Sequence, residues 1–215
     1  MSKEAYREAV SGVTHLIGAI LALIGVIWMI LLTRDDVPKL LSVVVFGVCM
    51  VLLYLASTTM HFTASIKGSK HRRVRFFNRL DHAAIYLMIA GSYTPFVYNL
   101  MVDQWRWLML GAVWLIALTG VIIKLFFFFG GYLSTLFYVG MGWLGVIAAP
   151  YAISVMEPNA LLLLATGGLV YTIGAVIFTL QRPNLHKYFG SHELWHLFVM
   201  AGSTCHFVAI LISVT

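Results

Sequence analysis

Residues 192–214 read HELWHLFVMAGSTCHFVAILISV, an apolar segment that begins with two histidines four positions apart. A helical crossing of a bilayer needs about 20 residues, and this segment is long enough. Side chains four positions apart lie on one face of a helix, so His192 and His196 would point the same way. Ionisable side chains are costly in hydrocarbon and generally mark a functional site. The segment therefore predicts a membrane-spanning helix that carries part of a site at its start.

Six other segments resemble it in length and apolar character. The chain of 215 residues is 61% hydrophobic and 10% charged, which is too apolar for a soluble domain of this size. We expect an all-α integral membrane protein, a seven-transmembrane-helix bundle that forms one domain over residues 1–215, with a short cytoplasmic segment at residues 1–11. The expected spans are Gly12–Thr33, Leu40–Phe62, Leu80–Leu100, Trp105–Leu125, Leu133–Val155, Asn159–Leu180 and His192–Val214.

Basic residues predict the orientation of this bundle. Seven spans place eleven Lys and Arg residues on the side of the N-terminus, and only Arg34, Lys39 and Arg106 on the other side. Because basic residues concentrate in cytoplasmic loops, the N-terminus is expected in the cytoplasm and the C-terminus outside. The net charge of +6 is then explained by topology and contact with anionic lipids of the cell membrane. We expect membrane lipids as partners and no nucleic acid.

A second polar pair, Ser57 and His61, has the same spacing of four near the end of the second span. Asp81 opens the third span. In the expected orientation His61, Asp81 and His192 share one membrane depth, close to the cytoplasmic face. Ser57 and His196 would lie one helical turn deeper, by about 6 Å. The sequence therefore predicts that these five side chains converge.

Three imidazoles beside a carboxylate suit zinc, which takes three protein ligands and a water at catalytic sites. We predict that Zn²⁺ is bound by His61, His192 and His196. Asp81 would bind or deprotonate the metal's water, and Ser57 would hydrogen-bond that water or a developing oxyanion. A single histidine could instead satisfy a hydrogen bond between helices. His15 is a candidate to orient a ligand, whereas His206 lies about 15 Å beyond His196 and is excluded.

Glu193 is open to two interpretations. Residues 192–196 match H-E-x-x-H, the zinc-protease pattern in which the glutamate is the general base. An intramembrane metalloprotease is therefore one alternative. In the other, Glu193 stabilises the start of the last helix, where a negative charge is favourable, and Ser191 caps that helix.

The ordered motifs resemble the hemolysin III branch of the progestin and adipoQ receptor family. The resemblance rests on Ser57-x-x-x-His61, Asn78-Arg79-Leu80-Asp81-His82, Gly91-Ser92-Tyr93-Thr94-Pro95 and His192-Glu193-Leu194-Trp195-His196. It implies seven helices over nearly the whole chain, with the metal ligands and polar residues already named. The wider superfamily includes alkaline ceramidases, which implies zinc-activated water and lipid amide chemistry.

We therefore expect a zinc-dependent hydrolase that acts on a lipid amide or ester. The family name also implies cytolytic or pore-forming activity, and the resemblance suggests a part in membrane-lipid or fluidity homeostasis. A sensor or receptor with a structural zinc is a further alternative, because a closed structural site has four protein ligands whereas a catalytic site keeps a position for water.

Overall fold

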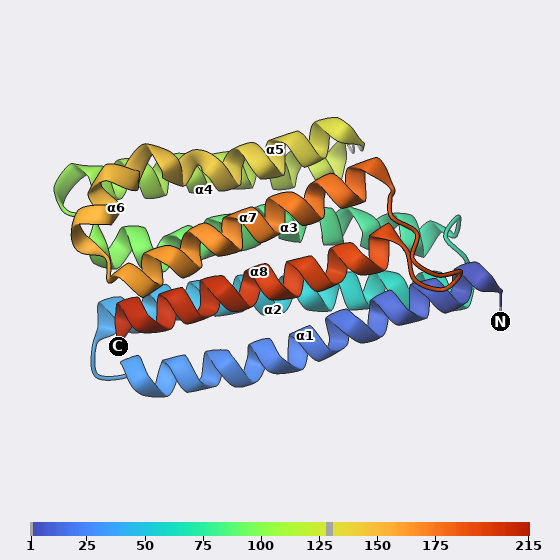
Figure 1. Ribbon diagram of the computed structural model, residues 1–215, viewed down its shortest axis with the longest axis horizontal. Helices are drawn as coiled ribbons and strands as arrows, with labels where there is room; N and C mark the ends of the chain where they lie inside the picture. The colour runs from blue at the N-terminus through green and yellow to red at the C-terminus, as the bar shows by residue number, and fades with distance from the viewer. Residues whose placement is uncertain (1, 128–130) are drawn as a thin grey trace.

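The computed structural model describes residues 2–127 and 131–215, and nearly all of them are helical (Figure 1). The elements in chain order are α1 (Lys3–Thr33), α2 (Val37–Lys67), α3 (Arg72–Leu100), α4 (Asp103–Phe126), α5 (Tyr132–Trp143), the 3₁₀ helix η1 (Leu144–Ala148), α6 (Ala149–Val155), α7 (Pro158–Leu180) and α8 (Ser191–Val214). The predicted all-α class is confirmed.

Acidic side chains cap the starts of two of the long helices. The Asp36 carboxylate accepts a hydrogen bond of 3.1 Å from the backbone N–H of Lys39 and caps α2, with Pro38 in the first turn. The Glu157 carboxylate caps α7 in the same way, 3.0 Å from the N–H of Ala160, and Pro158 follows it. An acidic cap with proline in the first turn fixes where a helix begins, because the first backbone N–H groups lack helical partners.

Within the described part of the chain, six helical segments are long and apolar enough to cross a membrane. They are α1, α2, α4, the stretch Tyr132–Val155, α7 and α8. The chain is thus a multi-pass membrane protein, as predicted. The predicted third span belongs to α3, which is helical over 29 residues but does not reach this apolar character. Its polar side chains, including Asp81, His82 and Asn99, lower its hydropathy.

Several helices extend beyond the predicted spans, and one predicted span is interrupted. Helix α1 begins at Lys3 rather than Gly12, and α3 begins at Arg72 rather than Leu80. Hydropathy marks where the hydrocarbon core of the membrane begins. Lys, Arg and Glu are good helix formers, so a helix can continue beyond that boundary. The fifth span is interrupted: α5 ends at Trp143, and η1 leads into α6. Pro150 in the first turn of α6 lacks the N–H that would continue the α-helical ladder.

The helices run along the long axis of the bundle, with the two ends of the chain at opposite ends of that axis (Figure 1). Helix α8 packs against α1, α3 and α7, and α2 packs against α1 and α3. Glycine permits close approach at one of these contacts: a Cβ added at Gly174 of α7 would lie 2.5 Å from the Cβ of Phe198 on α8. The contacts of α8 with α1 and α3 bring the first and last parts of the chain together, and these contacts position the site.

Candidate metal centre

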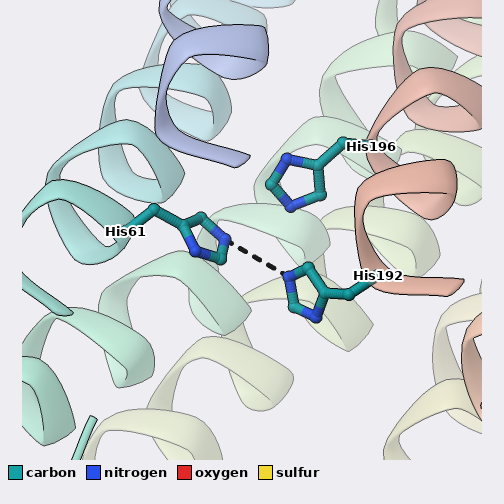
Figure 2. A group of neighbouring side chains, drawn as sticks. All are labelled: His61, His192 and His196. Carbon is teal, nitrogen blue, oxygen red and sulfur yellow. Dashed lines mark hydrogen bonds between the residues drawn. The ribbon is translucent and has the colours of Figure 1, made fainter. Parts of the chain in front are cut away.

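Three histidines from two helices meet near the N-terminal end of α8. His61 projects from α2, and His192 and His196 project from successive turns of α8 (Figure 2). One ring nitrogen of each lies within 4.8 Å of the others. His61 and His196 are each only 2% exposed. The predicted convergence of these three residues is confirmed, and they form a buried cluster that can hold a metal ion.

The spacing of the ring nitrogens suits zinc. The Nε2 atoms of His61 and His192 are 3.3 Å apart. Zinc–nitrogen bonds of about 2.0–2.1 Å in a tetrahedron place two ligand nitrogens about 3.4 Å apart. Two imidazole nitrogens at this separation can share a proton or a cation. The three-nitrogen donor set is one that zinc prefers, so the residues fit the predicted ion.

The buried imidazole of His196 is oriented by α1. Its Nδ1 lies 3.2 Å from the backbone carbonyl of Ser11 and 3.3 Å from the hydroxyl of Thr14. The Thr14 hydroxyl itself donates to the Ser11 carbonyl at 2.8 Å. Both neighbours therefore accept from His196, and its Nδ1 carries the hydrogen. The other nitrogen, Nε2, is left as the metal-binding atom.

Asp81 and Ser57 lie beside the cluster. The Ser57 side chain, 1% exposed, lies near the Asp81 carboxylate. Asp81 also interacts electrostatically with His61. The metal-binding group found among the described residues comprises the histidines alone, so Asp81 is adjacent to that group rather than inside it. The Asp81 carboxylate therefore does not occupy one of the predicted ligand positions.

Three further histidines lie outside the group of three. His15 stacks on His196 with ring centroids 3.6 Å apart and an interplanar angle of 13°, so it supports the position of the His196 ring. His206 packs edge-on against Tyr171, away from the cluster. His82 projects to the other side of α3, where its Nδ1 lies 3.2 Å from the Tyr138 hydroxyl.

Glu193 forms contacts that belong to the start of α8. Its two carboxylate oxygens accept from Arg7 Nε and Nη2 at 2.9 and 2.8 Å. One of them also accepts from the backbone N–H of Gly190 at 2.6 Å. Gly190, not Ser191, is the N-cap residue, so the capping residue predicted from sequence is off by one. Glu193 is 2% exposed and held by three donors, which leaves it poorly placed to accept a proton from a water.

A cavity of about 260 Å³ reaches the cluster from the N-terminal end of α1. His192 lines it together with Arg7, Glu8, Ser11 and Glu193. A second cavity of about 330 Å³ also reaches His192, between Phe178 of α7 and Ser191. His192 is the least buried of the three histidines. Both cavities therefore approach the cluster on the side of His192.

The site includes α1 residues that were not predicted from the sequence. Arg7, Glu8, Ser11 and Thr14 lie on one face of α1, and each contacts α2 or α8. Their spacing is itself a signal, since polar residues at intervals of three and four face one side of a helix. Three of the four residues lie before Gly12, where the predicted span begins, so hydropathy does not place them on the helix.

Comparison with known proteins shows which sequences this chain is similar to. The family described as "Haemolysin-III related" matches residues 3–207. "Hemolysin-3" of Bacillus cereus is 36% identical to this chain, over 98% of the chain and 93% of that protein. "Hemolysin-3 homolog" of Bacillus subtilis (strain 168) is 33% identical over 95% of the chain and 93% of that protein. The human "Monocyte to macrophage differentiation factor" is 28% identical over 95% of the chain and 83% of its own length.

The family match covers nearly the whole chain and includes all three clustered histidines, in agreement with the resemblance seen in the sequence motifs. This multi-pass membrane protein, with its buried three-histidine cluster, belongs to the haemolysin III-related family.

Proposed function

We propose that this protein is a zinc-dependent hydrolase that cleaves an amide or ester bond of a membrane lipid. The observation that carries the proposal is the combination of three converging imidazoles with a buried carboxylate just outside their group. Three protein ligands leave a coordination position for water, which is the arrangement of catalytic rather than structural zinc sites. The apolar bundle around the site favours a lipid as the substrate.

His61, His192 and His196 would hold the ion. When bound, zinc supplies a Lewis acid and brings the pKa of a coordinated water to about 7. Asp81 would accept the proton of the attacking water and deliver it to the leaving group. Ser57 would hold the Asp81 carboxylate in place by donating a hydrogen bond to it. The cavity beside His192 would admit the polar end of the lipid.

The metalloprotease alternative is weaker because of Glu193. A general base needs a free lone pair directed at the water, and three of the about four acceptor sites of this carboxylate are taken by Arg7 and the Gly190 N–H. The cytolytic alternative draws on the relatives called hemolysin-3. A conduction path does not require three converging histidines, so we place hydrolysis first. A sensor with a structural metal would need a fourth protein ligand.

We further propose that the protein lies in the cell membrane as seven spans, with its N-terminus in the cytoplasm. The 11-to-3 distribution of basic residues supports this orientation. The placement of the chain ends at opposite ends of the bundle also supports an odd number of crossings (Figure 1).

The proposal is tested by incubating the purified protein in mixed micelles with a ceramide and, separately, with a phospholipid ester. We expect fatty-acid release that stops when a chelator removes zinc and returns when zinc is restored. A double His192→Ala/His196→Ala variant should release none under any condition. Protein that carries zinc yet cleaves neither an amide nor an ester lipid would contradict the proposal and favour a structural metal.

A further inference from the structure

A carboxylate from α1 contacts one of the three clustered histidines. The Glu8 Oε2 atom lies 2.7 Å from Nδ1 of His61, and the two residues are 53 positions apart in the chain. The side chain of His61 is 2% exposed and that of Glu8 is 23% exposed. Glu8 therefore reaches from the water-facing edge of the site to a fully enclosed ring.

The contact determines which nitrogen of His61 carries a hydrogen. A carboxylate accepts hydrogen bonds, so the Nδ1 atom facing Glu8 must be the donor. The Nε2 atom then presents a lone pair in the neutral ring. That atom is the one 3.3 Å from Nε2 of His192, on the side where the three rings converge (Figure 2).

The position of Glu8 is itself fixed by its neighbour. Arg7 is bound to Glu193 through two hydrogen bonds, which ties this turn of α1 to the first turn of α8. The same face of α1 orients His196 through the Ser11 carbonyl one turn further on. Two of the three histidines, from different helices, are thus oriented by one face of α1. Carboxylate partners of this kind fix the tautomer of a ligand histidine and increase its basicity.

We propose that Glu8 is a positioning residue of the metal centre. It holds His61 as the Nδ1–H tautomer, with Nε2 directed at the metal, and raises the metal affinity of the site. The inference rests on the proposed function to the extent that it requires the histidine cluster to bind a metal. It does not require that a lipid be hydrolysed.

The test compares zinc affinity in Glu8→Gln, Glu8→Asp and wild type, by competition with a chromogenic chelator on metal-free protein. Removing such a carboxylate partner typically weakens metal binding 10- to 100-fold. We expect a loss of that size for Glu8→Gln and a smaller loss for Glu8→Asp, which keeps the charge on a shorter side chain.

Glu4→Gln is the matched control, because Glu4 lies one turn earlier on α1 and its carboxylate accepts from Ser69 rather than from a histidine. Its zinc affinity should equal that of wild type. A second readout is the visible spectrum of the cobalt-substituted protein, which reports ligand geometry. The spectrum should change in Glu8→Gln and not in Glu4→Gln.

The outcomes separate this inference from the proposed function. Wild-type affinity and an unchanged cobalt spectrum in Glu8→Gln would overturn the role of Glu8 while leaving the metal site in place. Failure of the wild-type protein itself to bind zinc would overturn both. Equal losses in Glu8→Gln and Glu4→Gln would also overturn the inference, because they would show a general effect of charge on α1. A loss in Glu8→Gln alone, partly restored in Glu8→Asp, supports it.

Discussion

The guanidinium of Arg7 and the carboxylate of Glu193 form a bidentate ion pair, although the two residues are 186 positions apart in the chain. The Nε–Oε1 and Nη2–Oε2 distances are 2.9 and 2.8 Å. The pair joins the first turns of α1 to the first turn of α8, next to the histidine cluster. It also accounts for a glutamate whose role the sequence motif alone leaves open. These contacts assign Glu193 to the structure around the start of α8.

Glu193→Gln should therefore lower stability and leave metal binding intact. The substitution removes a charge from a group that is almost fully buried against Arg7, and a lost charge-assisted hydrogen bond typically costs about 1.5–3 kcal/mol. We expect a lower melting temperature in detergent and unchanged zinc content. Arg34→Gln is a control with no expected effect, because its partner Asp35 is 94% exposed. Full stability with complete loss of hydrolysis would instead identify Glu193 as the base of a protease-like site.

Asp81→Asn should separate catalysis from metal binding. The amide cannot take a proton from water, so turnover of a lipid amide should fall about 10²- to 10⁴-fold, the usual contribution of a general base. Zinc content should be unchanged, because Asp81 lies outside the histidine group. Asp35→Asn, at an exposed carboxylate near the other end of α1, should have no effect on either quantity. If Asp81→Asn lost its zinc, Asp81 would be a ligand rather than a base.

Topology can be tested with single cysteines introduced at Arg73 and Asn159, both exposed, after replacing Cys49 and Cys205. The expected orientation places position 73 in the cytoplasm and position 159 outside. A membrane-impermeant maleimide added to intact cells should label Asn159→Cys and should reach Arg73→Cys only after permeabilisation. Labelling of both positions in intact cells would exclude the proposed orientation.

The close approach of α7 and α8 gives a prediction about stability. Gly174→Ala would place a methyl group 2.5 Å from the Cβ of Phe198, and overpacking of this kind typically costs about 1–3 kcal/mol. Gly168→Ala lies on the same helix with no atom within 4 Å of the added Cβ, and should be neutral or slightly stabilising. Thermal unfolding in detergent should rank the two variants in that order. Equal melting temperatures would argue against this packing.

The helices and the cluster of three histidines can be predicted from the sequence for clear physical reasons. Apolar length identifies a span, and polar residues spaced by four on an apolar helix identify a shared face, which led to His61, His192 and His196. Membrane depth then linked residues far apart in the chain, because the ends of helices lie at only two levels. These rules need no knowledge of which helices are neighbours.

The contribution of α1 could not be obtained in this way. The position of Glu8 against His61 depends on how α1 packs against α2 and α8, and hydropathy carries no information on that packing. Hydropathy also places the start of the predicted first span at Gly12, although the helix begins at Lys3. The ion pair that occupies Glu193 is equally non-local, so its motif alone left its role open.

The most direct test of the central claim is the zinc content of the purified protein, measured by elemental analysis. A site formed by His61, His192 and His196 predicts about one zinc per chain in wild type and in His206→Ala. The double His192→Ala/His196→Ala variant should carry almost none. Equal zinc content in wild type and the double variant would contradict the assignment of this cluster as a metal centre. So would wild-type protein that binds no zinc even after incubation with the ion.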